Sequence, residues 1–176
     1  MLQLCFDSEL YTEYIQKYIP RAREHIWIAT ADIKDMHVQS GKKYIPFLQV
    51  LQDLLQQQVE IQFLHAKEPG PRFRAHFDSY PAFLENPGFD RRMCPRQHSK
   101  MICVDQRWLY VGSANMTGAG LGSRGEHKRN FEAGFITDDK GFINQAADYF
   151  QSIFNGHHCD ACQHYDSCPD PIQLRE

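Results

Sequence analysis

Two short β-rich runs with an amphipathic helical segment between them limit the folds open to this chain. Residues 25–33 (HIWIATADI) and 59–64 (VEIQFL) are typical of strands, and residues 45–58 carry leucines at helical spacing. A strand, a helix and a strand in this order favour a right-handed crossover that joins two parallel strands. The first third of the sequence therefore predicts an α/β architecture.

The second half adds strands that can pair with this crossover. Residues 98–104 and 108–111 are β-rich and joined by the short turn 105–107, which predicts a hairpin. Residues 131–136 favour another strand, and residues 139–154 an amphipathic helix. We therefore expect a mixed β-sheet flanked by helices.

Two segments before the hairpin are less regular. Residues 8–24 carry apolar side chains at helical spacing, and Pro20 ends or kinks this helix. Residues 68–96 are rich in proline, glycine and arginine, which predicts a long loop with a short helix at 78–84. Long loops in compact domains are often functional.

Length and composition set the domain count and the expected compartment. The chain of 176 residues suits one domain, residues 1–156, followed by a short cysteine-rich tail, residues 157–176. Its net charge of −3 excludes a uniformly basic nucleic-acid-binding protein. No run is apolar enough to span a membrane, and the amino terminus turns polar too early for a signal peptide. A cytoplasmic location is expected, where six cysteines act as thiols or metal ligands before disulfides.

Polar residues suited to phosphate chemistry gather around the predicted hairpin. His98 and Lys100 are two apart on a strand and project from one face, and Ser113 and Asn115 return beside them at the end of the next strand. The Lys100 charge and the Ser113 and Asn115 donors suit the non-bridging oxygens of a phosphate diester, above all in its pentacovalent transition state. This set predicts phosphodiester chemistry.

His98 is the expected nucleophile. A neutral imidazole can attack phosphorus when a carboxylate orients its other ring nitrogen. Glu132, at the start of the next strand, is the candidate for that carboxylate. Asp105, at the turn, is expected to hold the hairpin and Lys100 in place.

The spacing of these residues resembles the HxKxxxxDxxxxxxGSxN signature, or HKD motif, of the phospholipase D superfamily. The matching residues are His98, Lys100, Asp105, Gly112, Ser113 and Asn115, and a downstream Asn-x-Glu element matches Asn130 and Glu132. Six fixed residue types coincide by chance at about 10⁻⁸ per starting position. The resemblance implies a phospholipase D-like fold and a phosphohistidine intermediate on His98.

The chain carries one such motif, whereas many members of the superfamily carry two. The mechanism of that superfamily uses one histidine to attack and another to protonate the leaving oxygen, and such acid catalysis is typically worth ~10²–10⁴ in rate. Members with one motif form symmetric dimers around a shared site. The resemblance therefore implies a homodimer that pools two copies of His98, Lys100 and Asn115.

Three arginines before the hairpin, Arg91, Arg92 and Arg96, bear on the substrate. They predict polyanion binding about as well as they predict simple solvation. With no element for gripping a bilayer, they favour a nuclease that cleaves DNA or RNA without a catalytic metal. Two alternatives stay open. One is a phospholipid hydrolase or phosphatidyl transferase with an apolar patch in residues 68–90, and the other is a nucleic-acid-binding protein with a vestigial site.

The cysteines of the tail predict a structural zinc ion. Cys159 and Cys162 have zinc-knuckle spacing, Cys168 supplies a third ligand, and Cys94 is the candidate for the fourth. A segment below roughly 40 residues usually needs a metal or a disulfide to hold its shape. An iron–sulfur cluster, a disulfide or a loose tail are the alternatives. Three histidines can replace Cys94 as a ligand, namely His157, His158 and His164.

Overall fold

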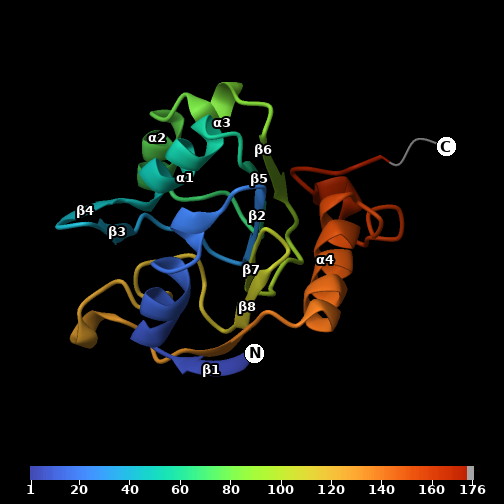
Figure 1. Ribbon diagram of the computed structural model, residues 1–176. Coiled ribbons are helices and arrows are strands. Elements are labelled where there is room, and N and C mark those ends of the chain that lie inside the picture. Colours follow the sequence, from blue (N-terminus) through green and yellow to red (C-terminus); the bar gives the residue numbers. More distant parts are fainter. Residues whose placement is uncertain (174–176) are drawn as a thin grey trace.

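A seven-stranded mixed β-sheet with helices on both faces forms the framework of the chain (Figure 1). The computed structural model describes residues 1–173. Across the sheet the strands are β1 (Leu2–Phe6), β9 (Ala133–Thr137), β8 (Trp108–Gly112), β7 (Met101–Val104), β2 (His25–Thr30), β5 (Glu60–His65) and β6 (Phe89–Met93). β2, β5 and β6 run parallel, and every other neighbouring pair is antiparallel. This confirms the predicted fold class.

The predicted crossover is present. α1 (Phe47–Gln56) connects β2 to β5, and the two strands pair in parallel. Leu48 and Leu51 of α1 are buried in the core, as their helical spacing predicts. The connection also contains a small hairpin of β3 (His37–Ser40) and β4 (Lys43–Pro46). This hairpin was not predicted, because most of its residues are polar and exposed.

The amino-terminal helix is shorter and less regular than predicted. Instead of one helix over residues 8–24, the chain forms a π-helix, η1 (Leu10–Ile15), and a 3-10 turn, η2 (Ile19–Arg21). Pro20 lies in this turn, and its missing N–H interrupts an α-helical hydrogen-bond ladder. Strand β1 was not predicted. It has only five residues, too few for their alternating exposure to form a clear pattern in the sequence.

The predicted loop over residues 68–96 is more ordered than its composition indicates. It contains α2 (Pro71–Asp78), α3 (Ala82–Glu85) and the edge strand β6. Pro71 opens α2 at a position that suits proline. No residue of β6 is buried, so the sequence lacks the apolar alternation that reveals a strand.

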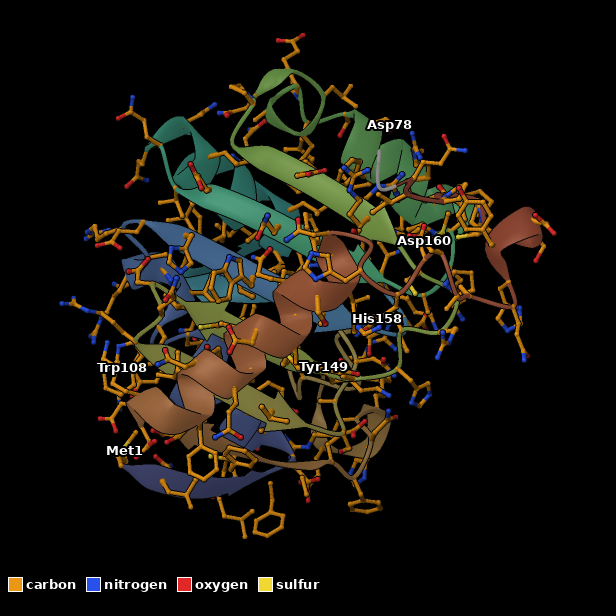
Figure 2. The ribbon with its side chains drawn as sticks, turned by 90° about the vertical axis from the view of Figure 1, so that its right-hand side faces the viewer. Met1, Asp78, Trp108, Tyr149, His158 and Asp160 are labelled. Atoms are coloured by element: carbon orange, nitrogen blue, oxygen red, sulfur yellow. The ribbon has the colours of Figure 1, made fainter. Side chains whose placement is uncertain are left out.

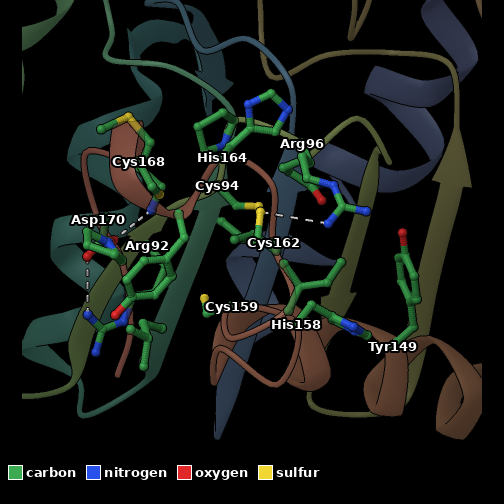
Figure 3. Close-up of a pocket in the computed structure, with 18 residues that line it drawn as sticks. Arg92, Cys94, Arg96, Tyr149, His158, Cys159, Cys162, His164, Cys168 and Asp170 are labelled. Atoms are coloured by element: carbon green, nitrogen blue, oxygen red, sulfur yellow. Dashed lines mark hydrogen bonds and ion pairs between the residues drawn. The ribbon is translucent and has the colours of Figure 1, made fainter. Parts of the chain in front are cut away.

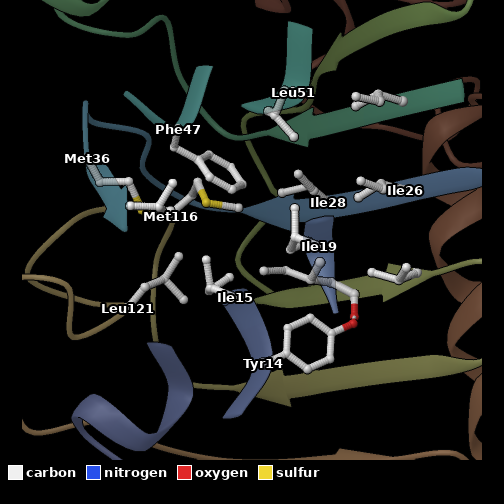
Figure 4. Packing of buried hydrophobic residues seen from close by; sticks show 14 of the residues in the cluster. Tyr14, Ile15, Ile19, Ile26, Ile28, Met36, Phe47, Leu51, Met116 and Leu121 are labelled. Carbon is white, nitrogen blue, oxygen red and sulfur yellow. Dashed lines mark hydrogen bonds between the residues drawn. The ribbon is translucent and has the colours of Figure 1, made fainter. Parts of the chain in front are cut away.

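Each face of the sheet carries its own apolar cluster. On one face, Tyr14 of η1 and Leu51 of α1 belong to the same buried cluster as Ile28 of β2 (Figure 4). On the other face, α4 (Lys140–Phe154) lies across the sheet (Figure 2). Its buried residues form a second cluster with Trp27 and its neighbours. The Asp139 carboxylate caps α4 by accepting two backbone N–H groups. The helix predicted over residues 139–154 is confirmed.

The tail after α4 consists of turns and one 3-10 turn, η4 (Tyr165–Ser167). None of residues 157–173 is buried, and residues 174–176 of the predicted tail lie outside the described residues. Among the described residues, no helix combines the length and the apolar character needed to cross a membrane.

The strands of the sheet begin and end along two opposite borders that carry different residues, and each border is called an edge below. The parallel strands β2, β5 and β6 end at one edge, where the antiparallel β7 begins and β8 ends. We call this the His98 edge, because His98 directly precedes β7. The turn between β7 and β8 contains Asp105 and marks the Asp105 edge. In Figure 2, Trp108, which follows that turn, lies at the left of the view, and His158 of the tail lies to the right of the middle.

Candidate active site

The sequence predicted a strand that begins at residue 98. In the structure β7 begins at Met101, so His98 and Lys100 lie directly before it. The pairing nevertheless extends to Lys100, whose carbonyl accepts the N–H of Gly112 at 3.1 Å. The Lys100 ammonium lies 2.7 Å from the His98 carbonyl oxygen and 3.1 Å from His98 Nδ1. His98 is exposed and Lys100 is half-buried. The predicted pair of imidazole and ammonium is therefore in contact and open to solvent.

Ser113 and Glu132 are joined across neighbouring strands. The Ser113 hydroxyl donates to the Glu132 carboxylate and accepts the N–H of Ala133 at 3.1 Å. Asn130 donates to the other Glu132 oxygen at 3.0 Å. Among the described residues, the side-chain hydrogen bonds of Glu132 run to Ser113 and Asn130, and the predicted contact with His98 is not formed.

Asn115 is held by its carbonyl oxygen. That oxygen accepts from the Thr30 hydroxyl at 3.3 Å and from the N–H groups of Ala31 and Asp32, both at 3.1 Å. These donors fix which end of the amide faces the strand β2. The NH₂ group of Asn115 is the end that can donate to an anion, as the predicted role requires.

Gly112 serves the packing beneath the site. A Cβ at Gly112 or at Gly134, its partner on β9, would overlap the Tyr110 side chain. The Tyr110 hydroxyl accepts the N–H of Ala114 at 3.3 Å, just before Asn115. The small glycines therefore leave room for the ring that supports the turn after β8.

Asp105 lies outside the site, at the opposite edge of the sheet. Its carboxylate accepts backbone N–H groups of Arg23, Glu24 and His25 at 2.8–3.1 Å. The prediction that Asp105 holds the hairpin agrees with these bonds, but the prediction that it positions Lys100 is wrong, because β7 separates the two residues.

The three arginines predicted as a substrate-binding group do not act together. Arg91 pairs with Glu68 at 3.9 Å, and Arg92 with Asp170 at 3.6 Å. Both lie on β6, which β5 and β2 separate from β7. Arg96 lies in the turn before His98 and points to the tail, where it contacts a cysteine sulfur (Figure 3). Their role in substrate binding stays a prediction, and in this structure the three side chains contact Glu68, Asp170 and the tail.

Three other cations lie between motif residues in the sequence, whereas two strands separate Arg91 and Arg92 from β7 in the sheet. Arg124, Lys128 and Arg129 belong to the loop between the site residues Asn115 and Glu132, and they form no ion pair within residues 1–173. The basic run RGEHKR, residues 124–129, lies between the two motif elements and is the sequence feature that could have pointed to these cations.

Two lysines contact Asp32, whose backbone N–H donates to the Asn115 side chain. Lys34 and Lys67 contact the Asp32 carboxylate at 3.2 and 3.3 Å. Burial alone would raise the pKa of Asp32, but the bonds from the two lysines outweigh it and lower that pKa. Asp32 is therefore ionised at neutral pH and holds two ammonium groups beside Asn115.

A family model described as "Cardiolipin synthase, PLD-like domain" matches residues 15–154. The chain belongs to the phospholipase D superfamily. Its fold is similar to NucT from Helicobacter pylori (TM-score 0.63, 14% identity, 98% of this chain and 100% of that chain). It is also similar to Nuc, a phospholipase D family member from Salmonella typhimurium (TM-score 0.60, 16% identity, 98% and 99%). No curated protein matches the sequence.

A third structure extends the fold comparison of this phospholipase D superfamily member. TrmBL2, an archaeal chromatin protein with a novel mode of DNA binding, is similar over 87% of this chain and 51% of its own length (TM-score 0.60, 14% identity). At these identities the three likenesses establish the phospholipase D-like fold, which confirms the resemblance found in the sequence.

The four cysteines predicted as metal ligands line one cavity of this superfamily member, of about 220 Å³, between the turn before His98 and the tail. All six cysteines of the chain are free thiols. Within residues 1–173, no three His, Cys, Asp or Glu side chains are grouped closely enough to hold a metal ion as they stand.

Proposed function

We propose that this chain is a phosphodiesterase that cleaves nucleic acid through a phosphohistidine formed on His98. The observation that carries the proposal is the position of His98, Lys100, Ser113 and Asn115 around the adjoining ends of β7 and β8. An ammonium, a hydroxyl and an amide there can hold the non-bridging oxygens while the imidazole attacks phosphorus.

The contact between Lys100 and His98 sets the order of events. Attack through Nε2 requires the proton of a neutral imidazole to sit on Nδ1, yet Nδ1 faces the Lys100 ammonium, which cannot accept it. Binding of a phosphate diester draws Lys100 to the phosphate oxygens. Nδ1–H is then free to donate to a carboxylate, and Glu132, already held by Asn130, is the one we propose.

The chemistry then proceeds in two displacements. Nε2 of His98 forms a bond to phosphorus as the ester P–O bond breaks, and the leaving oxygen takes a proton from His98 of the partner subunit. Water next attacks phosphorus, gives its proton to the partner subunit's His98, and breaks the P–N bond. No step in this sequence needs a metal ion.

A second copy of the chain is part of the proposal, because one motif supplies only one of the two histidines. Phe131 supports a symmetric dimer over the site. It lies between Asn130 and Glu132, and 97% of its side chain is exposed. A second copy that covers the site would bury this ring. Heterodimers of wild-type and His98→Ala subunits should retain little activity, and an active monomer in light scattering would contradict the shared site.

Nucleic acid is the proposed substrate because the loop between the two motif elements carries three cations. Arg124, Lys128 and Arg129 lie in the loop that joins the two motif elements, and a backbone of phosphates is the ligand that such a loop attracts. TrmBL2, which shares the fold, binds DNA. Six free thiols suit a reducing compartment, so we place this activity in the cytoplasm.

A phospholipid substrate is the second candidate, and strand β1 is the feature that favours it. Leu2, Leu4 and Phe6 expose 65%, 63% and 52% of their side chains in one row along this edge strand. Such a row suits an interfacial contact with lipid. It lies outside residues 68–90, where the sequence analysis placed a lipid-binding patch.

A substrate panel tests both candidates. Purified protein is incubated with labelled single- and double-stranded DNA, RNA and phosphatidylcholine vesicles, each with and without EDTA. We expect EDTA-resistant cleavage of a nucleic acid and an acid-labile phosphoenzyme after rapid quench. Cleavage of the lipid alone would favour the second candidate, and loss of all cleavage on brief EDTA treatment would contradict the metal-independent mechanism.

A further inference from the structure

The thiol cavity joins two segments that are far apart in the sequence. Cys94 enters it from the turn after β6, whereas Cys159, Cys162 and Cys168 enter it from the tail after α4 (Figure 3). In the tail these three cysteines are half-buried, while most of their neighbours are exposed. The chain therefore directs all four thiols inward to the same space.

Tight turns present the cysteines to this space. Backbone bonds from Gln97 to Cys94 at 2.8 Å and from Cys162 to Cys159 at 2.9 Å close two short turns. Each turn therefore holds a cysteine against the cavity that the four thiols line.

Positive charge lies next to the sulfurs. The Arg96 guanidinium is 3.8 Å from the Cys162 sulfur. Arg92, which also lines the cavity, pairs with Asp170 of the tail at 3.6 Å. Four thiolates around a divalent ion carry a net charge of −2, which nearby arginines offset. Two structural arginines of β6 and its turn thus acquire a role in place of substrate binding.

The tail has few other means of holding its shape. None of residues 157–173 is buried. Apart from the thiols, Asp170 accepts the N–H of Met93 at 2.9 Å, and Ile172 packs against Gly156. A segment this short and this exposed does not fold on apolar burial alone. A metal ion supplies the missing free energy directly.

We propose that Cys94, Cys159, Cys162 and Cys168 form a structural zinc site that fastens the tail to the turn before His98. The sulfurs surround the cavity, and zinc would draw them in to about 2.3 Å from the ion. A closed four-thiolate site has no open position for chemistry. Cys94 precedes His98 by four residues, so the ion would also fix the approach of the chain to the catalytic histidine.

Metal analysis tests the site independently of any nuclease activity. The full chain is purified without a metal-affinity resin, with its thiols reduced, and its zinc, iron and sulfide are measured. About one zinc per chain is expected for a structural site. Less than about 0.2 zinc per chain against that expectation, a stoichiometric iron–sulfur cluster, or a disulfide among the four cysteines would each overturn the proposal.

Variants identify the ligands. Cys162→Ser should lower the zinc content to background, and Cys94→Ser should do the same. Cys5→Ala is the matched control, because Cys5 is a buried residue of β1, which is the last strand on the side of the sheet opposite to β6 and the tail. His158 and His164 also line the cavity, so His158→Ala and His164→Ala should keep the zinc. Zinc release on titration with an organomercurial, at about four thiols per ion, supports four sulfur ligands. Zinc that survives Cys94→Ser or is lost in either histidine variant would overturn this ligand set.

Discussion

The two ends of the β7–β8 hairpin use similar polar residues for opposite purposes. At the Asp105 edge, one carboxylate is saturated by three backbone N–H groups and ties the turn to the start of β2. At the His98 edge, Lys100 contacts His98 and Ser113 contacts Glu132, and His98, Ser113 and Glu132 keep contact with solvent. One end stabilises the fold, and the other leaves its groups available for chemistry.

This contrast shows that a shared motif does not imply a shared site. Asp105 and His98 belong to the same sequence signature, yet a full strand separates them. The spacing shows that both residues match the signature. Only their hydrogen bonds distinguish the residue that is open to substrate from the residue that stabilises the fold. The following predictions separate the two roles.

The largest effect is expected at the His98 edge. His98→Ala should lower the rate of phosphodiester cleavage by at least about 10⁴-fold, because it removes both the nucleophile and, in the partner, the acid. His98 is exposed, so the free energy of unfolding should stay within about 0.5 kcal/mol of the wild type. Single-turnover assays and urea unfolding measure the two quantities. A residual rate of one tenth would exclude His98 as the nucleophile.

Asp105 should give the opposite result. Asp105→Ala leaves three backbone N–H groups without their carboxylate and should cost about 2–3 kcal/mol of unfolding free energy. Asp105 has φ +52°, which asparagine tolerates better than alanine, so Asp105→Asn should cost less. Activity per folded molecule should not change. A hundredfold loss of kcat in Asp105→Asn, with stability kept, would place Asp105 in the catalytic machinery after all.

Substrate binding should follow the same division. Replacing Arg124, Lys128 and Arg129 with alanine should raise KM for an oligonucleotide about tenfold or more and flatten its salt dependence, since each phosphate contact contributes ~0.7–0.9 to that slope. The matched control carries alanine at three exposed arginines of the Asp105 edge, namely Arg21, Arg23 and Arg107. Equal effects of the two triple variants would contradict a substrate path at the His98 edge.

Much of the architecture could be predicted because periodic apolar residues mark buried elements. The crossover through α1, the β7–β8 hairpin and α4 all have such patterns. Strand β6 lacked one, because an edge strand with no buried residue needs no alternation. The position of His98 and Lys100 at one edge followed from hairpin geometry, which is local in sequence.

The partners of the charged residues could not be predicted in the same way. The sequence predicted that Arg91 and Arg92 serve the site, but it did not reveal their partners, Glu68 in the loop before α2 and Asp170 in the tail. Glu132 binds Ser113 because β8 and β9 are neighbours, a fact of sheet order that no local pattern contains. Long-range pairing therefore limited the prediction of the site.

The smallest effect distinguishes two histidines at the two edges. Burial lowers the pKa of His65, which ends β5 at the His98 edge, and of His25, which begins β2 at the Asp105 edge. Negative charges on Asp105 and Glu24 partly offset the effect at His25. The Nε2 atoms of both rings lack a partner among the described residues, but His65 is fully buried and His25 only half-buried, so proton uptake by His65 is the more costly.

These shifts make acid destabilise the protein. Below pH 6.5, the ordinary pKa of histidine, His65 takes up a proton more readily in the unfolded chain than in the folded protein. The free energy of unfolding therefore falls as pH decreases, by at most ~1.4 kcal/mol per pH unit and per histidine. Urea unfolding between about pH 7.5 and 5.5 brackets this value. His65→Asn should flatten the dependence more than His25→Asn, whatever either variant does to stability at pH 7.5. A larger flattening by His25→Asn would show that the charges at the Asp105 edge do not protect its histidine.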